Sequence, residues 1–212
     1  MRSYIVYTEG YKNSKQLANN LSHQARSNGL DPELVSSVKA ADIETEAENL
    51  GLKFASIGNI DYKRERQANG ITHYKLYKQI TEPTFIMEYD VTFIGGLPES
   101  IPSEGVIQVS NHNNINFHAC SLKLSNKSFT SRYRPEEPLE QKIIEHYETK
   151  GLYRWPLYKL MGTSGYIMTP ASAQRMCEYI EKHGVKFGDR ISTLEVGEGN
   201  LYGYAPFTVR TT

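Results

Sequence analysis

The first 38 residues follow the order strand, helix, strand, and this order constrains the fold more than any other feature of the sequence. Residues 3–8 (SYIVYT) are β-branched and aromatic and predict a strand, and residues 33–38 (ELVSSV) predict a second one. Between them, a helix is expected to begin at Asn13 or Ser14 and to end at Asn28-Gly29. Its apolar face is expected to hold the residues that recur every fourth position, which are Leu17, Leu21 and Ala25. A strand–helix–strand unit of this kind begins an α/β domain.

The rest of the sequence continues to alternate between the two kinds of element. Strands are predicted at residues 84–93, 105–110, 165–168 and 201–209, and helices at residues 66–80, 135–151 and 170–184. The last helix begins at a Thr169-Pro170 cap, and its buried face is expected to hold Ala173, Met176, Cys177 and Ile180. Residues 111–134 are polar and predict a long irregular connection, a kind of segment that often carries function. Together these elements predict a single three-layer α/β domain over residues 1–212, with a mostly parallel central sheet.

The composition excludes several classes of protein. The chain carries 24 basic and 24 acidic side chains, and this zero balance excludes a surface that is basic throughout. Its two cysteines are too few for a disulfide framework. The N-terminus does not resemble a signal peptide and no apolar run approaches a membrane span, so we expect a cytoplasmic protein with no transmembrane segment. The 15 tyrosines, against 7 Phe and 1 Trp, suit a surface that stacks on polar ligands, although biased genome composition gives the same count.

Two carboxylates follow the most apolar run of the chain. Glu88 and Asp90 are two residues apart where the strand predicted at residues 84–93 loses its apolar character. Alternate residues of a strand point to the same side, so both carboxylates are expected to face one spot at the carboxyl edge of the sheet. Open α/β sheets bind ligands at that edge, and hard divalent cations prefer oxygen ligands. The alternative is a solvated pair of acids, or a pair bound to a nearby Lys or Arg.

The same region carries a resemblance to a known family. Residues 70–80 (GITHYKLYKQI) and 81–93 (TEPTFIMEYDVTF) resemble the helix and acidic strand of the family 25 glycosyltransferases, which include lipopolysaccharide and procollagen sugar transferases. That family has Gly-Cys-x-x-Ser-His on the helix and Glu-Asp-Asp-Val at the strand end. This sequence has Thr72-His73-Tyr74 and Glu88-Tyr89-Asp90-Val91. Residues 162–180, 187–189 and 204–207 are similar to later family motifs, in the same order.

The sequence departs from the family pattern at three places. Tyr89 replaces the middle acid, Thr72 replaces a serine and no cysteine precedes it, and the first loop reads Thr8-Glu9-Gly10-Tyr11-Lys12 in place of Asn-Leu-x-x-Arg. These differences keep open a divergent donor or acceptor, and a domain that binds a nucleotide or carbohydrate without turning it over.

The resemblance implies a GT-A-type, Rossmann-related fold and a metal-dependent, inverting transfer of a sugar from a nucleotide-sugar to an acceptor hydroxyl. It implies a UDP-sugar donor bound by residues 1–110 and an acceptor bound by residues 111–212. Mn²⁺ or Mg²⁺ would be held by Asp90 and Glu88 and would neutralise the charge that builds on the leaving diphosphate. Glu88 would also contact hydroxyl groups of the sugar or the ribose.

Four further residues are expected to contact the donor: Thr8, Glu9, Lys12 and His73. Lys12 is close to the start of the first helix, where it could reach phosphate oxygens or lie on an ordinary solvated face. His73 matches the family's histidine and could bond the donor or the strand end, or it could be a packed, hydrogen-bonded histidine.

The resemblance also assigns a base for the acceptor hydroxyl. Asp189 matches a late aspartate of the family and is the first candidate for the carboxylate that takes the proton. Glu195 and Glu198 follow in a Gly-rich loop as reserves, and the alternative role for Asp189 is an ion pair with Arg190.

The acceptor is expected to contact two basic, aromatic segments. Residues 123–134 (KLSNKSFTSRYR) include Arg132, Tyr133 and Arg134 and contain no acid, and residues 150–159 include Trp155. Basic and aromatic residues together can follow a nucleic-acid backbone and stack on an unstacked base, and the alternative is a solvated basic loop. Ser164 lies in the similarity at residues 162–180 and is a further candidate for acceptor binding.

Two acceptors fit these features. The first is a hydroxymethylated cytosine in bacteriophage DNA, which an enzyme in the host cytoplasm would extract from the base stack. The second is a lipopolysaccharide or capsule saccharide. The sequence contains neither G-x-G-x-x-G after the first strand nor a P-loop, which disfavours a Rossmann-type dehydrogenase and a P-loop nucleotidase. It does not specify an oligomeric state.

Overall fold

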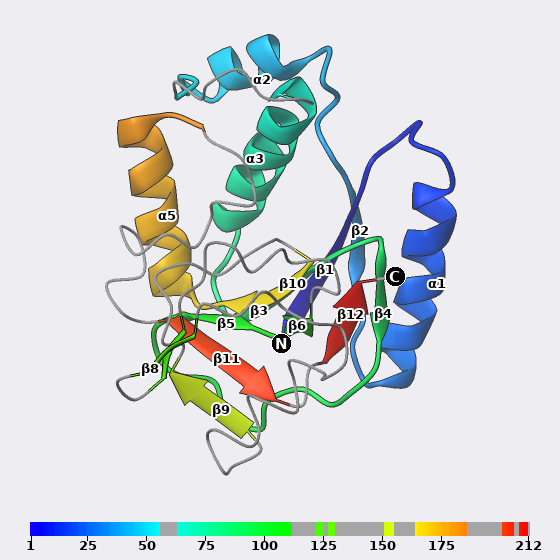
Figure 1. Cartoon of the computed structure of the whole chain (residues 1–212). Helices are drawn as coiled ribbons and strands as arrows, with labels where there is room; N and C mark the ends of the chain where they lie inside the picture. Colours follow the sequence, from blue (N-terminus) through cyan, green and yellow to red (C-terminus); the bar gives the residue numbers. More distant parts are fainter. Residues whose placement is uncertain are drawn as a thin grey trace.

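A seven-stranded sheet organises the molecule (Figure 1). The computed structural model describes residues 1–55, 63–111, 122–124, 127–129, 151–154, 164–185, 201–205 and 208–211. The strands of the sheet, in their spatial order, are β2 (Glu33–Ser36), β1 (Arg2–Tyr7), β3 (Thr84–Glu88), β10 (Gly165–Met168), β5 (Val106–Gln108), β11 (Leu201–Ala205) and β9 (Gly151–Arg154).

Most strands of this sheet run in one direction. β1 pairs in parallel with β2 and with β3, and β5 pairs in parallel with β11. β10 lies between β3 and β5 and is antiparallel to both, while β9 is antiparallel to β11 at the edge. Strands β2, β1, β3, β5 and β11 therefore share a direction, and the predicted α/β class with a mostly parallel central sheet is confirmed.

Helices cover both faces of the sheet, as Figure 1 shows. The described helices are α1 (Ser14–Ser27), α2 (Ile43–Asn49), α3 (Lys63–Tyr77) and α5 (Pro170–His183). Ala18, Leu21 and Ala25 of α1 pack against one face together with Ile5, Phe85 and Met87 of the sheet. The side chains of α3 and α5 pack against the other face, in a buried cluster that also includes Ile43 and Ala47 of α2. The three layers expected from the sequence are present.

The helices agree with the sequence patterns except in detail. α5 begins at Pro170, ends at His183 before Gly184 and buries Ala173, Met176, Cys177 and Ile180, as predicted, although the Thr169 side chain makes no capping hydrogen bond. α3 begins and ends three residues earlier than the predicted 66–80. The expected apolar face of α1 is wrong at Leu17, whose side chain is 41% exposed. Ala18 is buried in its place, because a helix also brings residues three positions apart onto one face.

The strand predicted at residues 84–93 is wrong as a single element. β3 ends at Glu88, residues 89 and 90 form a turn, and β4 (Val91–Phe93) joins a separate three-stranded sheet. In that sheet β4 pairs with β12 (Val209–Thr211), which also pairs with β6 (Ser110–Asn111). The pairing with β12, distant in sequence, redirects the chain at the polar Glu88-Tyr89-Asp90 segment. Apolar composition alone does not distinguish one long strand from two short ones.

Other boundaries also differ from the prediction. The predicted strand at 105–110 is divided into β5 and β6, and the strand at 201–209 into β11 and β12. The irregular connection expected at 111–134 contains a strand pair, β7 (Leu122–Leu124) and β8 (Lys127–Phe129). Residues 135–150 of the helix predicted at 135–151 lie outside the described residues. Its last residue, Gly151, is the first residue of β9.

Candidate functional site

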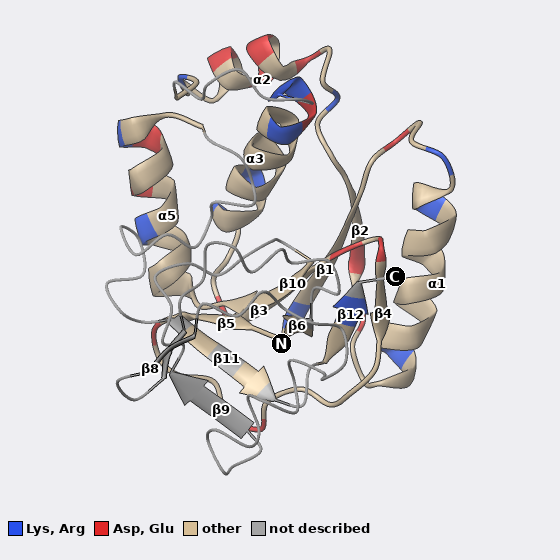
Figure 2. Ribbon diagram, viewed as in Figure 1, with Lys and Arg blue, Asp and Glu red and all other residues tan. Residues whose placement is uncertain are grey.

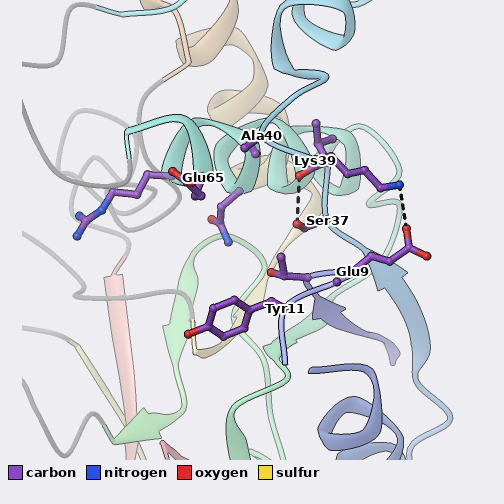
Figure 3. A pocket seen from close by; sticks show the side chains of 12 residues that line it. Glu9, Tyr11, Ser37, Lys39, Ala40 and Glu65 are labelled. Carbon is purple, nitrogen blue, oxygen red and sulfur yellow. Dashed lines mark hydrogen bonds and ion pairs between the residues drawn. The ribbon is translucent and has the colours of Figure 1, made fainter. Parts of the chain in front are cut away.

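A cavity of about 480 Å³ lies beyond the carboxyl ends of β1 and β2. Three segments line it: residues 8–11 after β1, residues 37–40 after β2, and residues of the first two turns of α3. Figure 3 shows side chains from these segments facing the same space. The carboxyl ends of parallel strands are the position at which open α/β sheets bind ligands. We refer to this cavity as the strand-end pocket.

The loop after β1 forms a compact turn that shapes one wall of the pocket. The Ser14 hydroxyl donates to the carbonyl of Thr8, and the Tyr11 amide donates to the same carbonyl at 3.2 Å. Thr8, Glu9 and Tyr11 line the pocket, and the Tyr11 side chain is 53% exposed. Lys12 is exposed and does not line the pocket, and its φ of 32° lies in the left-handed region.

The second wall is tied to α3 by the hydroxyl of Thr72. The side chain of Thr72 accepts a hydrogen bond from the Val38 amide at 2.8 Å and donates one to the Ala68 carbonyl at 2.8 Å. Val38 and Ala68 both line the pocket, so Thr72 fixes the loop after β2 against the helix. Thr72 occupies the position at which the resemblance expects serine, and serine carries the same hydroxyl.

Ion pairs hold the start of α3 and one edge of the pocket. Lys39 and Glu9 form an ion pair at 3.4 Å across the two loops, as Figure 3 shows. Arg64 at the start of α3 binds both carboxylate oxygens of Glu44 on α2 at 2.6 Å. Figure 2 shows charged residues gathered on α2 and the first turns of α3. The strand-end pocket therefore combines acidic and basic groups in balance and is not a purely basic phosphate cradle.

Asn69 joins the pocket to the acidic end of β3. It lines the pocket, and its Nδ2 donates to the Oε1 of Glu88 at 3.3 Å. On the opposite side, the backbone amide of Glu88 donates to the carbonyl of Ser164 at 3.0 Å. Glu88, Ser164 and the pocket wall are therefore brought together. Ser164 itself is buried, so its side chain lies beneath the site.

Asp90 lies in the turn that follows β3. Because residues 89 and 90 form a turn, the argument that strand alternation aims Glu88 and Asp90 at one spot does not apply. Burial raises the pKa of Asp90 above its ordinary value. Burial, followed by the charges of Asp90, Tyr11 and Glu88, raises the pKa of Tyr89 to about 12, so the residue in place of the family's middle acid is a neutral phenol at physiological pH.

His73 lies beneath the pocket, inside the core. Its side chain is 0% exposed, and its Nδ1 is 2.6 Å from the hydroxyl of Tyr166, which is 2.9 Å from the hydroxyl of Tyr77. Burial lowers the pKa of His73 to about 3, so the ring is neutral near pH 7. Of the two alternatives drawn from the sequence, the packed, hydrogen-bonded histidine describes this arrangement.

The remaining predicted site residues lie outside the described residues. They are Asp189, Arg132, Tyr133, Arg134 and Trp155, together with the reserves Glu195 and Glu198. Within the described part of the chain, no group of three or more His, Cys, Asp or Glu side chains is placed to hold a metal ion. Every described helix is too short or too polar to cross a membrane.

Sequence reasoning missed several residues of the pocket. Lys39, Glu65 and Asn69 line it, yet none belongs to a motif assigned to ligand binding from the sequence, and Tyr11 lies in the first-loop motif without having been assigned a contact itself. Two signals were present: the excess of tyrosine, and the position of these loops directly after the first two strands of an α/β unit. Neither signal identifies which α3 residues face the loops, because that depends on the packing of α3 over the sheet.

Comparison with known proteins finds similarity in structure but none in sequence. No family model matches the chain, and no curated protein sequence matches it. Among solved structures, the fold is similar to that of mouse xyloside xylosyltransferase 1 in its apo form, with a TM-score of 0.38 and 6% sequence identity. The similarity covers 91% of this chain and 80% of that chain. A similarity at this level assigns no activity to this protein.

Proposed function

We propose that the strand-end pocket binds the nucleotide of a nucleotide-sugar and that the protein transfers the sugar to an acceptor hydroxyl. The observation that carries the proposal is the pocket beyond β1 and β2, linked through Asn69 to Glu88 at the end of β3. A donor that lies in this pocket can extend toward the acidic end of β3. The family 25 resemblance supports the same use of these segments.

The pocket offers a stacking surface for a nucleotide base. Tyr11 is the large aromatic side chain among the lining residues, and more than half of its surface is exposed. Aromatic rings stack on bases with little sequence preference. UDP is the nucleotide that the family resemblance implies, and we propose a UDP-sugar as the donor.

The carboxylates at the end of β3 and in the turn that follows it suit a divalent cation. Glu88 and Asp90 are hard oxygen donors of the kind that Mn²⁺ and Mg²⁺ prefer, and both would hold the ion together with phosphate oxygens of the donor. A bound ion would neutralise the charge that develops on the leaving diphosphate. Asn69 orients the Glu88 carboxylate for this role through its hydrogen bond.

The second half of the proposal concerns the acceptor. We propose an inverting transfer in which Asp189 takes the proton of the acceptor hydroxyl.

The acceptor is a hydroxymethylated base in bacteriophage DNA, contacted by Arg132, Tyr133, Arg134 and Trp155, or a lipopolysaccharide or capsule saccharide. Duplex DNA carrying hydroxymethylcytosine should bind with an affinity that falls steeply with salt. Negligible affinity at low salt would exclude DNA as the acceptor.

A thermal-shift screen tests donor binding directly. UDP, GDP, UDP-glucose and UDP-galactose are added with and without MnCl₂, and a ligand at a hundred times its dissociation constant should add about 2.7 kcal/mol to the free energy of unfolding. Tyr11→Ala should weaken the shift, because it removes the stacking surface. If none of these ligands shifts the unfolding transition, the proposed function is contradicted.

Donor hydrolysis tests the assignment of the metal ligands. Asp90→Asn should abolish hydrolysis of the bound UDP-sugar in the presence of manganese. Asp31→Asn is the matched control, because Asp31 is exposed and pairs with Arg26 away from the pocket. An Asp90→Asn protein as active as the wild type would show that Asp90 is not a metal ligand.

A second candidate function is a domain that binds a nucleotide or carbohydrate without turnover. The neutral Tyr89 in place of the middle acid is the observation that favours it. Thermal shifts with nucleotide-sugars but no release of UDP, with water or with either class of acceptor, would support this function over transfer.

A further inference from the structure

The side chain of Asn69 has two polar atoms, and they have different environments. Nδ2 donates to Glu88, as described above. Oδ1 is buried and has no hydrogen-bond donor among the described residues. Asn69 itself lines the strand-end pocket between the loop after β1 and the loop after β2.

The Glu88 carboxylate fixes the direction in which Oδ1 points. A carboxylate accepts hydrogen bonds, so the amide must turn its NH₂ group toward Glu88. The amide is planar and rigid, and its oxygen is therefore held on the side away from that carboxylate. A rotation that satisfied Oδ1 elsewhere would break the bond to Glu88.

A buried carbonyl oxygen without a donor is unfavourable, because it has lost its hydrogen bonds to water. The surrounding residues do not relieve this cost, since none of the described ones supplies a donor. Oδ1 has almost no exposed surface, so a ligand hydroxyl relieves this cost only if its binding displaces the side chains that cover the oxygen. Phosphate oxygens cannot do so, because they are acceptors when ionised.

We infer that Asn69 is a specificity-determining residue whose Oδ1 accepts a hydrogen bond from a hydroxyl group of the ligand. This inference rests on the proposed function and adds to it the chemistry that the pocket selects, which is a hydroxylated ring and not the phosphates. The hydroxyl belongs to the ribose of the nucleotide or to the transferred sugar. A site built around such an acceptor binds the corresponding deoxy ligand less well, since its oxygen then stays unpaired.

The test is a double-mutant cycle between ligand hydroxyls and Asn69. Dissociation constants are measured by calorimetry for UDP, its 2′-deoxy and 3′-deoxy forms, UDP-glucose and UDP-2-deoxyglucose. For the wild type, removal of the relevant hydroxyl should weaken binding by about five- to tenfold. For Asn69→Ala the same removal should have almost no effect, because the acceptor is already absent.

Two further variants control for misfolding and for the loss of an amide side chain elsewhere. Asn69→Leu keeps the size of the side chain without its polar atoms, and it replaces Asn69→Ala if that protein does not fold. Gln79→Ala is the matched control, because Gln79 is an exposed residue just after α3 whose side-chain amide donates to the Lys75 carbonyl and does not line the pocket. Gln79→Ala should retain the full deoxy penalty.

The outcomes separate the inference from the proposed function. A deoxy penalty that disappears in both Asn69 variants supports the inference, and the ligand that shows it identifies the ribose or the sugar as the source. Equal penalties in wild type and variants overturn the inference and leave the proposed function standing. If neither UDP nor UDP-glucose binds the wild type, both are overturned together.

Discussion

The face of the sheet under α1 is buried by aliphatic side chains and phenylalanine, whereas the face under α3 and α5 also buries four tyrosines and a histidine. The tyrosines are Tyr4, Tyr74, Tyr77 and Tyr166, and the histidine is His73. On the α1 face, the buried cluster contains no tyrosine, and the tyrosines that pack against it are only partly buried.

This difference follows the position of the candidate site. Glu88 and Asn69 lie on the α3 side, near the hydrogen-bonded chain of His73, Tyr166 and Tyr77. Burial raises the pKa of both Tyr77 and Tyr166 well above the ordinary value, and the nearby charge of Glu88 acts in the same direction. The buried cluster on the α1 face is apolar, while the α3–α5 face adds hydrogen bonds between buried side chains.

The largest expected effect lies on the α1 face. Leu21 is 1% exposed, so Leu21→Ala should lower the free energy of unfolding by about 3 kcal/mol through lost packing and the cavity left behind. Leu17→Ala on the same helix is the matched control, since Leu17 is largely exposed and should cost much less. Urea unfolding at pH 7 measures both. Equal costs would contradict the assignment of the buried face of α1.

The helix ends give the next comparison. Gly29 after α1 and Gly184 after α5 have φ values of 80° and 84°. A Cβ at Gly184 would lie 2.7 Å from the Ala55 amide nitrogen and 2.8 Å from the Lys53 oxygen, whereas nothing lies within 4 Å at Gly29. Gly184→Ala should therefore cost about 2 kcal/mol or more, and Gly29→Ala about 1 kcal/mol. Thermal unfolding of the two variants checks the order, and a larger loss at Gly29 would refute it.

Removal of one hydroxyl tests the polar chain under the pocket. Tyr166→Phe leaves both His73 and Tyr77 without that partner, and it should lower the free energy of unfolding by about 1.5 kcal/mol. Tyr74→Phe is the control, because its hydroxyl bonds Glu181 near solvent and water can replace it. Denaturant titration should show a smaller loss for Tyr74→Phe. If Tyr166→Phe is as stable as the wild type, the chain contributes nothing to stability.

The pH dependence of the free energy of unfolding tests a feature of the α3–α5 face alone, the buried neutral ring of His73. His73 has a folded pKa of about 3 against an ordinary 6.5, so only the unfolded chain binds a proton at this ring between those values. The stability that depends on a neutral His73 is present above pH 6.5 and is lost as the pH falls, by at most about 1.4 kcal/mol per pH unit. His73→Phe should flatten this slope in urea titrations from pH 7 to pH 5. His23→Gln, on the exposed side of α1, should leave it unchanged.

The sequence by itself determined the elements whose signals are local. The opening strand–helix–strand order and the start of α5 at Pro170 are present as predicted, because apolar periodicity and the fixed backbone angle of proline act within a few residues. The acidic end of β3 was found in the same way. Glu9 and Thr8 were placed at the pocket by the position of their loop in the family resemblance.

Only the tertiary structure decided what these elements build. The turn at residues 89–90 depends on the pairing of β4 with β12, whose residues are more than a hundred positions away. The pocket joins two loops that meet because β1 and β2 are parallel neighbours, and Asn69 faces them because α3 packs over that end of the sheet. Contacts between distant segments leave no periodic pattern in the sequence. The hydrogen bond between Asn69 and Glu88 is therefore visible only in the tertiary structure.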